Sequence, residues 1–232
     1  MKTCLALQEA GSLLKCNCDG IIVENMADLP YQRPNQRGPE TVAIMTEISS
    51  EIRRKYCDAT IGVQILSGGS CEALAVAAAS DLDFIRLESF VFGHIGDEGY
   101  TESNAALALR YRKQIGAENV KIFTDIKKKH SSHAITADVD IIDTAIAADF
   151  FLSDGLIITG SHTGVAASPD ELTAVKDKVN LPVFIGSGIT SENIDAFQLA
   201  DGLIVGSEFK IDGKWQNELD LNRIKKLTKA NQ

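Results

Sequence analysis

Strand-like and helix-like segments alternate along this chain, and this alternation limits the folds that it can adopt. Runs rich in Val, Ile and Leu are separated by amphipathic stretches at a spacing of roughly 25 to 35 residues, which is typical of βα units on a parallel sheet. The runs lack polar alternation, as expected for a sheet buried on both faces. Strands are predicted at 20–25, 60–66, 84–90, 120–126, 155–159, 182–185 and 202–205.

Helices are predicted between and around these strands. Their ranges are 3–15, 40–56, 70–80, 103–115, 141–152, 168–179, 191–199 and 219–229. The start at Ser168 is the clearest, because Pro169 follows it directly and Glu171 completes a capping box. Residues 93–99 are predicted to form a glycine-rich loop. We therefore predict an α/β fold, a TIM-type (β/α)8 barrel, as a single domain over residues 1–232.

The predicted barrel is incomplete at its N-terminus, because the first element is a helix and seven strands are encoded. An open sheet would leave two unpaired edges. A partner chain in a homo-oligomer, rearranged termini or a truncated sequence would each account for them. Truncation or an alternative start is the interpretation we favour.

Composition narrows the classes of partner. The 232 residues are 44% hydrophobic and 24% charged, with a net charge of −9 and a pI near 5.0. No basic face is therefore expected for nucleic acid or for an anionic membrane. No apolar run approaches the roughly 20 residues that span a bilayer, and the chain opens directly into a helical pattern without a signal peptide.

The five cysteines form no C-x-x-C pair and are odd in number, which indicates a reducing compartment, either the cytoplasm or the mitochondrial matrix. Cys16-Asn17-Cys18 is either a metal or redox site or, as we favour, a helix-end turn with incidental thiols. No cofactor is predicted, and no spacing resembles a zinc motif. Mg²⁺ held by carboxylates stays an open alternative.

Two strands near the C-terminus run directly into glycine and serine. The first reaches Gly186, Ser187 and Gly188, and the second reaches Gly206 and Ser207. Glycines at strand ends let backbone N–H groups approach an anion, and the last two loops of a (β/α)8 barrel are the usual phosphate site. These residues are predicted to bind a phosphate, the alternative being ordinary tight turns.

Candidate acid–base groups follow two other strands. Glu24 and Asn25 end the first strand, where a carboxylate can act as a base and the amide can bind ligand. Asp125 ends another strand, with Lys129 and His130 in the loop beyond it, and this set can transfer protons and stabilise an anion. Loop capping is the structural alternative for Glu24.

Neighbouring charges admit structural explanations. Arg86 and Glu88 lie on one face of their strand, so a structural ion pair is as plausible as a catalytic role. Lys127 and Lys128 are interpreted as solvated charges.

Motifs spread over residues 5–227 together resemble the BtpA family, through their order and spacing rather than through any one of them. They are Asp19–Asn25, Arg37–Thr41, Phe84–Arg86, Asp97–Gly99, Asp125 with Lys129 and His130, Ile158–Gly160 with Thr163 and Gly164, and Gly186–Gly188 with Asn193.

The resemblance implies a ribulose-phosphate-binding type of barrel and adds Thr163 and Gly164 to the ligand-binding candidates. It leaves two functions open. One is an isomerase, lyase or aldolase-type enzyme acting on a small phosphorylated metabolite. The other is a non-catalytic assembly or stability factor, because the family is named for a cyanobacterial factor needed for photosystem I accumulation. A phosphate-sensing barrel and a truncated, inactive isoform are weaker alternatives.

The chain departs from the family's pattern in two places. It begins after the family's N-terminal strand and the loop that follows that strand. Where the family usually reads Gly-Val-Asn-Val-Leu-Arg-Asn-Asp, residues 62–69 read Gly-Val-Gln-Ile-Leu-Ser-Gly-Gly. The family's Arg and the Asn that follows it are thus replaced by Ser67 and Gly68, which puts ligand binding beside this strand in doubt.

Overall fold

The structure is a computed structural model that describes residues 2–160 and 165–230. The described chain forms two compact units. Unit 1 contains the residues up to Glu88 together with Asn104–Phe123, and unit 2 contains Ser89–Ser103 and the chain from Thr124 onward. Strand β6 (Lys121–Ile126) begins in unit 1 and ends in unit 2.

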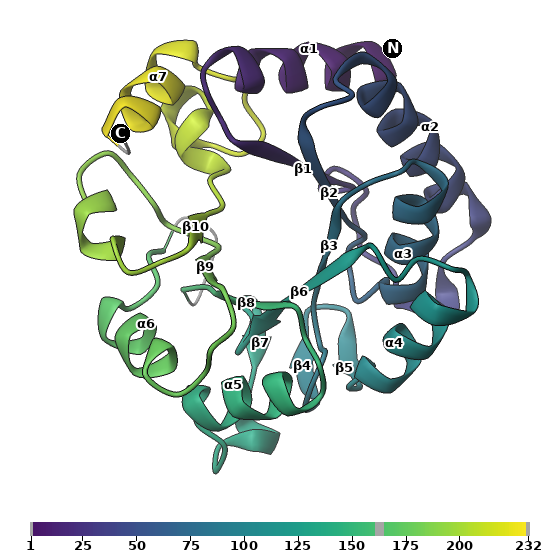
Figure 1. The fold of residues 1–232 in the computed structure, drawn as a ribbon, viewed down its shortest axis with the longest axis vertical. Helices are drawn as coiled ribbons and strands as arrows, with labels where there is room; N and C mark the ends of the chain where they lie inside the picture. Colours follow the sequence, from purple (N-terminus) through teal and green to yellow (C-terminus); the bar gives the residue numbers. More distant parts are fainter. Residues whose placement is uncertain (1, 161–164, 231–232) are drawn as a thin grey trace. The chain divides into compact units, whose positions relative to one another are not determined.

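Unit 1 is built on parallel strands in the order β1-β2-β3-β6. These are β1 (Gly20–Glu24), β2 (Thr60–Gln64), β3 (Phe84–Leu87) and the start of β6. The helices α1 (Lys2–Lys15), α2 (Pro39–Lys55), α3 (Ser70–Ala79) and α4 (Ala105–Gln114) pack in sequence against one another on the outer side of these strands (Figure 1). A short 3₁₀ turn, η1 (Pro34–Gln36), precedes α2.

Unit 2 continues from β6 in the order β6-β8-β9-β10, with β8 (Gly155–Ile158), β9 (Val183–Ile185) and β10 (Gly202–Leu203). Its helices are α5 (Ile141–Phe150), α6 (Pro169–Lys176) and α7 (Leu221–Ala230). A second, antiparallel sheet has the order β5-β4-β7, from β4 (His94–Gly96), β5 (Gly99–Thr101) and β7 (Ser131–Ser132). The 3₁₀ turns of unit 2 are η2 (Ala134–Thr136), η3 (Ile194–Phe197), η4 (Ser207–Phe209) and η5 (Ile211–Gly213).

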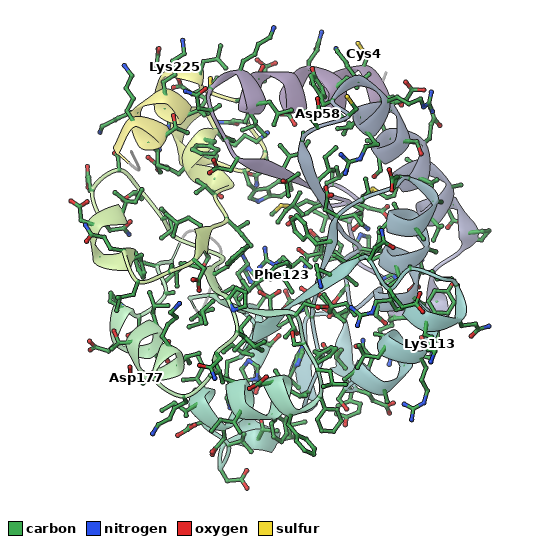
Figure 2. The ribbon with its side chains drawn as sticks, viewed as in Figure 1. Cys4, Asp58, Lys113, Phe123, Asp177 and Lys225 are labelled. Atoms are coloured by element: carbon green, nitrogen blue, oxygen red, sulfur yellow. The ribbon has the colours of Figure 1, made fainter. Side chains whose placement is uncertain are left out.

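The interior of each unit is aliphatic, as the continuous apolar strands predict. In β8, Leu156, Ile157 and Ile158 are all fully buried, which requires cover on both faces of the strand. In unit 1 the rings of Phe84 and Phe123 meet edge to face at 5.5 Å between centroids, and Phe123 is labelled in Figure 2. In unit 2, Lys225 of α7 is exposed and is labelled in Figure 2, whereas the neighbouring Ile224 is fully buried.

The N-cap predicted at Ser168 of α6 is confirmed. Ser168 Oγ accepts a hydrogen bond from the N–H of Glu171 at 3.3 Å, and Pro169 occupies the first helical position. The side chain therefore satisfies one of the N–H groups that a helix start leaves without an internal acceptor.

The helix predicted at 191–199 is wrong in type, because the structure forms only the 3₁₀ turn η3 (Ile194–Phe197) there. Asn193 explains the difference. Its Oδ1 accepts from the N–H of Thr190 at 2.8 Å, and its Nδ2 donates to the carbonyl of Gly188 at 2.8 Å. These local bonds compete with the helical ladder.

The segment 93–99 is also more ordered than a loop. It carries β4 and its turn into β5, and Ile95 pairs with Tyr100 across the hairpin. Gly99, at φ +108°, permits the reversal of direction.

Candidate active site

Unit 1 gathers buried charges at the carboxyl ends of β1, β2 and β3. Arg86, only 6% exposed, places Nη1 3.7 Å from Glu24 Oε1. Arg86 is thus paired with Glu24, and the alternative of an Arg86–Glu88 ion pair stays a prediction. Glu24 thus stands beside a buried cation at the end of β1, and its catalytic role stays a prediction.

Asn25 binds the backbone of the segment after β2. Its Oδ1 accepts from the N–H of Leu66 at 2.7 Å, and its Nδ2 donates to the carbonyl of Leu66 at 3.1 Å. Both ends of the amide are thus engaged within unit 1. This geometry holds the end of β2 beside β1, and the predicted contact of Asn25 with a ligand stays a prediction.

Glu88, the residue after β3, contacts the turn that follows β2. Its Oε2 accepts from Ser67 Oγ at 3.1 Å and from the N–H of Gly68 at 3.1 Å. Glu88 is 8% exposed and Ser67 is 3% exposed, so this is a buried carboxylate bound by a serine hydroxyl and a glycine N–H. Arg37 supports the turn by donating to the carbonyl of Ser67 at 2.8 Å.

In unit 2 Asp125 is 7% exposed and lines a small cavity together with Lys128, which is 8% exposed. The interpretation of Lys128 as a solvated charge is therefore wrong. Its Nζ lies 3.6 Å from Glu98 Oε1, and both side chains are mostly buried. The hairpin of β4 and β5 delivers Glu98 to this place, and no local pattern around Lys128 signals such a partner.

The two other predicted groups of this loop lie elsewhere. Lys129 is half-buried, and its backbone N–H donates to Thr159 Oγ1 at 3.1 Å. His130 is exposed, with φ at +55°. Neither residue lines the cavity, which His94 and His133 reach instead. The catalytic roles of Lys129 and His130 stay predictions.

The first predicted phosphate turn is closely packed. The N–H of Gly186 donates to the carbonyl of Ile158 at 2.7 Å. Ser187 Oγ accepts from the N–H of Gly160 at 2.7 Å and donates to the carbonyl of Val165 at 2.9 Å. Gly188 has φ +71°, and a Cβ there would lie 2.2 Å from the backbone nitrogen of Ala166, so only glycine fits.

The second predicted turn is open. A Cβ added at Gly206 would meet nothing within 4 Å, and Ser207 begins η4. The N–H groups of Gly188 and Gly206 donate to no acceptor within residues 2–160 and 165–230. Thr163 and Gly164, the remaining ligand-binding candidates, lie outside the described residues.

The chain contains a short internal repeat, which the sequence interpretation missed. The pattern Val-x-Ile-x-Ser-Gly-x-Ser/Thr occurs at 63–70 and again at 183–190. Both turn glycines have positive φ, +63° at Gly68 and +71° at Gly188. This repeat could have shown from the sequence that each unit contains a Ser-Gly turn after a strand.

The strands that follow these turns start alike. Asp83 Oδ2 accepts from the N–H of Ile61 at 2.7 Å, and Asp201 Oδ2 accepts from the N–H of Val183 at 2.7 Å. Ser67 comes six residues after Ile61, and Ser187 comes four residues after Val183. Because side chains alternate along a strand, an even difference keeps both serines on the same face of their strands.

A side chain distinguishes the two turns. Five residues after Asp83 the chain carries Glu88, and five residues after Asp201 it carries Gly206. The first Ser-Gly turn is thus filled by a carboxylate of the protein, whereas the residue five positions after Asp201 has no side chain.

Within the described residues, no three His, Cys, Asp or Glu side chains converge as a metal site. Nor does that part of the chain contain a helix with the length and apolarity needed to cross a membrane. The thiols of Cys16 and Cys18 are free.

The fold is that of TIM-type barrel enzymes. A (S)-3-O-geranylgeranylglyceryl phosphate synthase from Thermoplasma acidophilum is similar with a TM-score of 0.62 and 18% identity, covering 97% of this chain and 86% of that one. A thiamine phosphate pyrophosphorylase from Pyrococcus furiosus has a TM-score of 0.60 and 16% identity, covering 97% and 88%. At this identity the likeness concerns the fold alone, and it confirms the predicted fold class.

Sequence relatives are closer. An uncharacterised protein of Caenorhabditis elegans, named as mitochondrial, is 47% identical over 226 residues, covering 96% of this chain and 81% of the relative. The photosystem I biogenesis protein BtpA of Synechocystis is 34% identical over 233 residues, covering 97% and 78%. The sequence model of the BtpA family matches residues 4–232, so the chain belongs to the BtpA family.

Proposed function

We propose that this protein binds the phosphate of a small phosphorylated metabolite at the Ser-Gly turn of unit 2. The donors in this proposal are the N–H groups of Gly188 and Gly206 and the hydroxyl of Ser207. The observation that carries the proposal lies in unit 1, where the Ser67-Gly68 turn binds the anionic Oε2 of Glu88 by two hydrogen bonds of 3.1 Å. A turn with the same residues is therefore chemically suited to an oxyanion.

The absence of a side chain at Gly206 supports an external anion in unit 2. Gly206 stands five residues after Asp201, as Glu88 stands after Asp83, and a Cβ added at Gly206 would meet no described residue within 4 Å. Gly188 is half-buried and Gly206 is exposed, so their two N–H donors, without acceptors in the described chain, are favourable to an incoming phosphate oxygen.

The names of the structural neighbours agree with this chemistry. One neighbour was solved with sn-glycerol-1-phosphate, and others are named as phosphoribosyl anthranilate isomerases. Acid–base chemistry of the isomerase, lyase or aldolase type would then need a proton-transfer group. Asp125 is our candidate, because its carboxylate lies at the end of β6 and lines a cavity.

The proposal is tested by placing a carboxylate beside the second turn. Gly206→Glu is expected to abolish binding of inorganic phosphate and ribose 5-phosphate in calorimetric titrations, because its carboxylate would repeat the position of Glu88. A Cβ at Gly206 would meet no described residue within 4 Å, so the variant is expected to fold.

The matched control is Gln198→Glu, which adds the same charge at an exposed position of unit 2. Unchanged binding by Gly206→Glu, or an equal loss in both variants, would refute the site. If the wild-type protein binds neither compound, the proposed function is wrong.

A non-catalytic assembly factor is the second candidate, and two observations favour it. The Synechocystis relative is named for photosystem I biogenesis. The end of α5 also exposes Phe150, Phe151 and Leu152 by 80%, 46% and 69%, a cluster of apolar groups of the kind that partners cover.

Rescue of cells that lack the gene separates the two functions. An assembly factor predicts that Asp125→Asn rescues and that the double variant Phe150→Ser, Phe151→Ser fails, whereas an enzyme predicts the reverse. The compartment belongs to the same proposal. We propose the mitochondrial matrix, in line with the name of the worm relative and with five reduced cysteines.

A further inference from the structure

A second polar site lies in unit 2, in the cavity that Asp125 and Lys128 line. Its volume is about 20 Å³, which is room for a single oxygen-sized group. Ser89, His94 and His133 are among the other residues that line it. The phosphate turns at Gly188 and Gly206 contribute nothing to this lining, so the two sites are separate.

The lining of this cavity is rich in charged side chains. Lys127 and Lys128 both line it, against the single carboxylate of Asp125. Lys128 is 8% exposed, and Oε1 of Glu98 stands 3.6 Å from its Nζ. A buried ammonium in a small polar cavity attracts an anionic oxygen.

Ser89 supplies a donor that the described chain does not use. Its Oγ is buried, the residue being 3% exposed, and it has no hydrogen-bond partner among the described residues. A buried hydroxyl without a hydrogen bond is rare and lowers stability unless a ligand or a water molecule forms that bond.

His94 and His133 also line the cavity. His94 lies on β4, with its ring centroid 5.5 Å from that of His133. His133 Nε2 lies 3.0 Å from the carbonyl oxygen of Lys128, so this nitrogen carries the proton that it donates. The backbone of the Lys128 loop is thereby tied to the small antiparallel sheet.

Backbone strain gathers around the same place. Ser89, Phe92, Lys127 and His130 have φ between +52° and +59° without being glycine. These four residues lie in the loops after β3 and β6 that form the cavity wall or flank it. Strain of this kind persists where the surrounding structure enforces a particular arrangement of side chains.

We propose that this cavity binds one oxygen of a carboxylate, with Ser89 Oγ and Lys128 Nζ as its donors. The inference rests on the proposed function and deepens it. The metabolite of this protein then belongs to the phosphorylated carboxylic acids, with its phosphate at the Ser187-Gly188 turn and its carboxylate in this cavity.

The test compares ligands that differ by the carboxylate. Methyl phosphate is titrated into the protein beside 2-phosphoglycolate, 3-phosphoglycerate and 4-phosphoerythronate, in which one, two and three carbons separate the two acidic groups. Because a charge-assisted hydrogen bond adds about 1.5–3 kcal/mol, at least one acid is expected to bind about tenfold or more tightly than methyl phosphate. Glycolate alone is titrated as well, so that the carboxylate site is probed without a phosphate.

The variants Lys128→Met and Ser89→Ala are expected to remove that advantage and to leave methyl phosphate binding unchanged. Ser89→Ala breaks no hydrogen bond of the described chain and keeps the protein testable if Lys128→Met unfolds. Lys178→Met, at an exposed position of unit 2, controls for the lost charge.

Equal affinity of all four phosphates, together with no saturable glycolate binding, would overturn this inference while the phosphate site stands. An advantage that survives in both Lys128→Met and Ser89→Ala would overturn it too. If no phosphate binds but glycolate does, and both variants lose it, the cavity is supported and the phosphate proposal falls.

Discussion

At the scale of single residues, the decisive contrast is between Glu88 and Gly206. Each stands five residues after an aspartate that starts a strand, yet one fills a Ser-Gly turn and the other leaves it open. Sequence patterns identified Gly206 and Ser187 as candidates. They did not identify the contact of Glu88 with Gly68, because a turn and a strand far apart in sequence form it.

Replacing Glu88 tests how much its carboxylate stabilises unit 1. Glu88→Ala leaves the buried Ser67 hydroxyl and Gly68 N–H without this acceptor, and we expect a loss of about 2 kcal/mol in the free energy of unfolding. Glu88→Gln keeps one acceptor oxygen and is expected to lose less. Urea unfolding measures both, with the exposed Glu118→Ala as control. A loss no larger than that of the control would show that the two hydrogen bonds stabilise nothing.

The thiol of Cys18 is a second test at this scale. Burial, followed by Cys16 and Asp19, raises the pKa of Cys18 to about 11. Only about one thiol in a thousand is then ionised at pH 8, so iodoacetamide is expected to label Cys18 far more slowly than the exposed Cys57. Peptide mass spectrometry from about pH 7 to about pH 10 should show the Cys18 rate still rising about tenfold per pH unit. A plateau within that range would contradict the raised pKa.

At the scale of elements, periodicity predicted the strands well and the loops poorly. The parallel strands and α6 were predictable because burial and capping are encoded locally, as in Leu156–Ile158 and Ser168. The hairpin of β4 and β5 was missed, because its pairing with β7 joins segments more than thirty residues apart. That hairpin carries His94, which lines the cavity, and Glu98, which pairs with Lys128, so the cavity was missed with it.

Asp201 ties the start of β10 to β9 through the N–H of Val183, and acid should weaken this tie. Burial raises the pKa of Asp201, but hydrogen bonds from Lys176 and from the N–H of Val183 outweigh it, so the net shift is downward from 3.8. A depressed folded-state pKa means that the stabilisation is present above pH 3.8 and is lost as pH falls below it.

Asp201→Asn is therefore expected to lower stability at neutral pH and to change it little at low pH. The side chain is 41% exposed, so screening limits the effect to about 1 kcal/mol or less. Denaturation curves at neutral pH and at about pH 3 give the comparison. A deficit that is the same at both pH values would contradict the role of the charge.

At the scale of the whole molecule, the fold class followed from the alternation of strands and helices, and the comparisons confirm it. The single domain stays a prediction, since contacts divide the described chain into two compact units. The function did not follow from the fold, because many chemistries share it. What narrows the function here is particular chemistry, an open turn at Gly206 and a buried cation at Lys128.

Strand β6 belongs to both units, and this predicts joint unfolding. Loss of either unit would strip β6 of one hydrogen-bonded neighbour, β3 or β8. Fluorescence of Trp215, the single tryptophan and a residue of unit 2, is therefore expected to follow the same urea transition as far-UV circular dichroism. Two separate midpoints would show that the units unfold independently.

The unequal room around Gly188 and Gly206 has a consequence for how substitutions would be tolerated. No other amino acid fits at Gly188, whereas Gly206 has open space around its Cα. In a saturation library sorted only for folded protein, Gly188 should stay fixed while Gly206 accepts many replacements. Sorting the same library for biological activity should then restrict Gly206 as well, which would separate the demands of ligand recognition from those of chain packing.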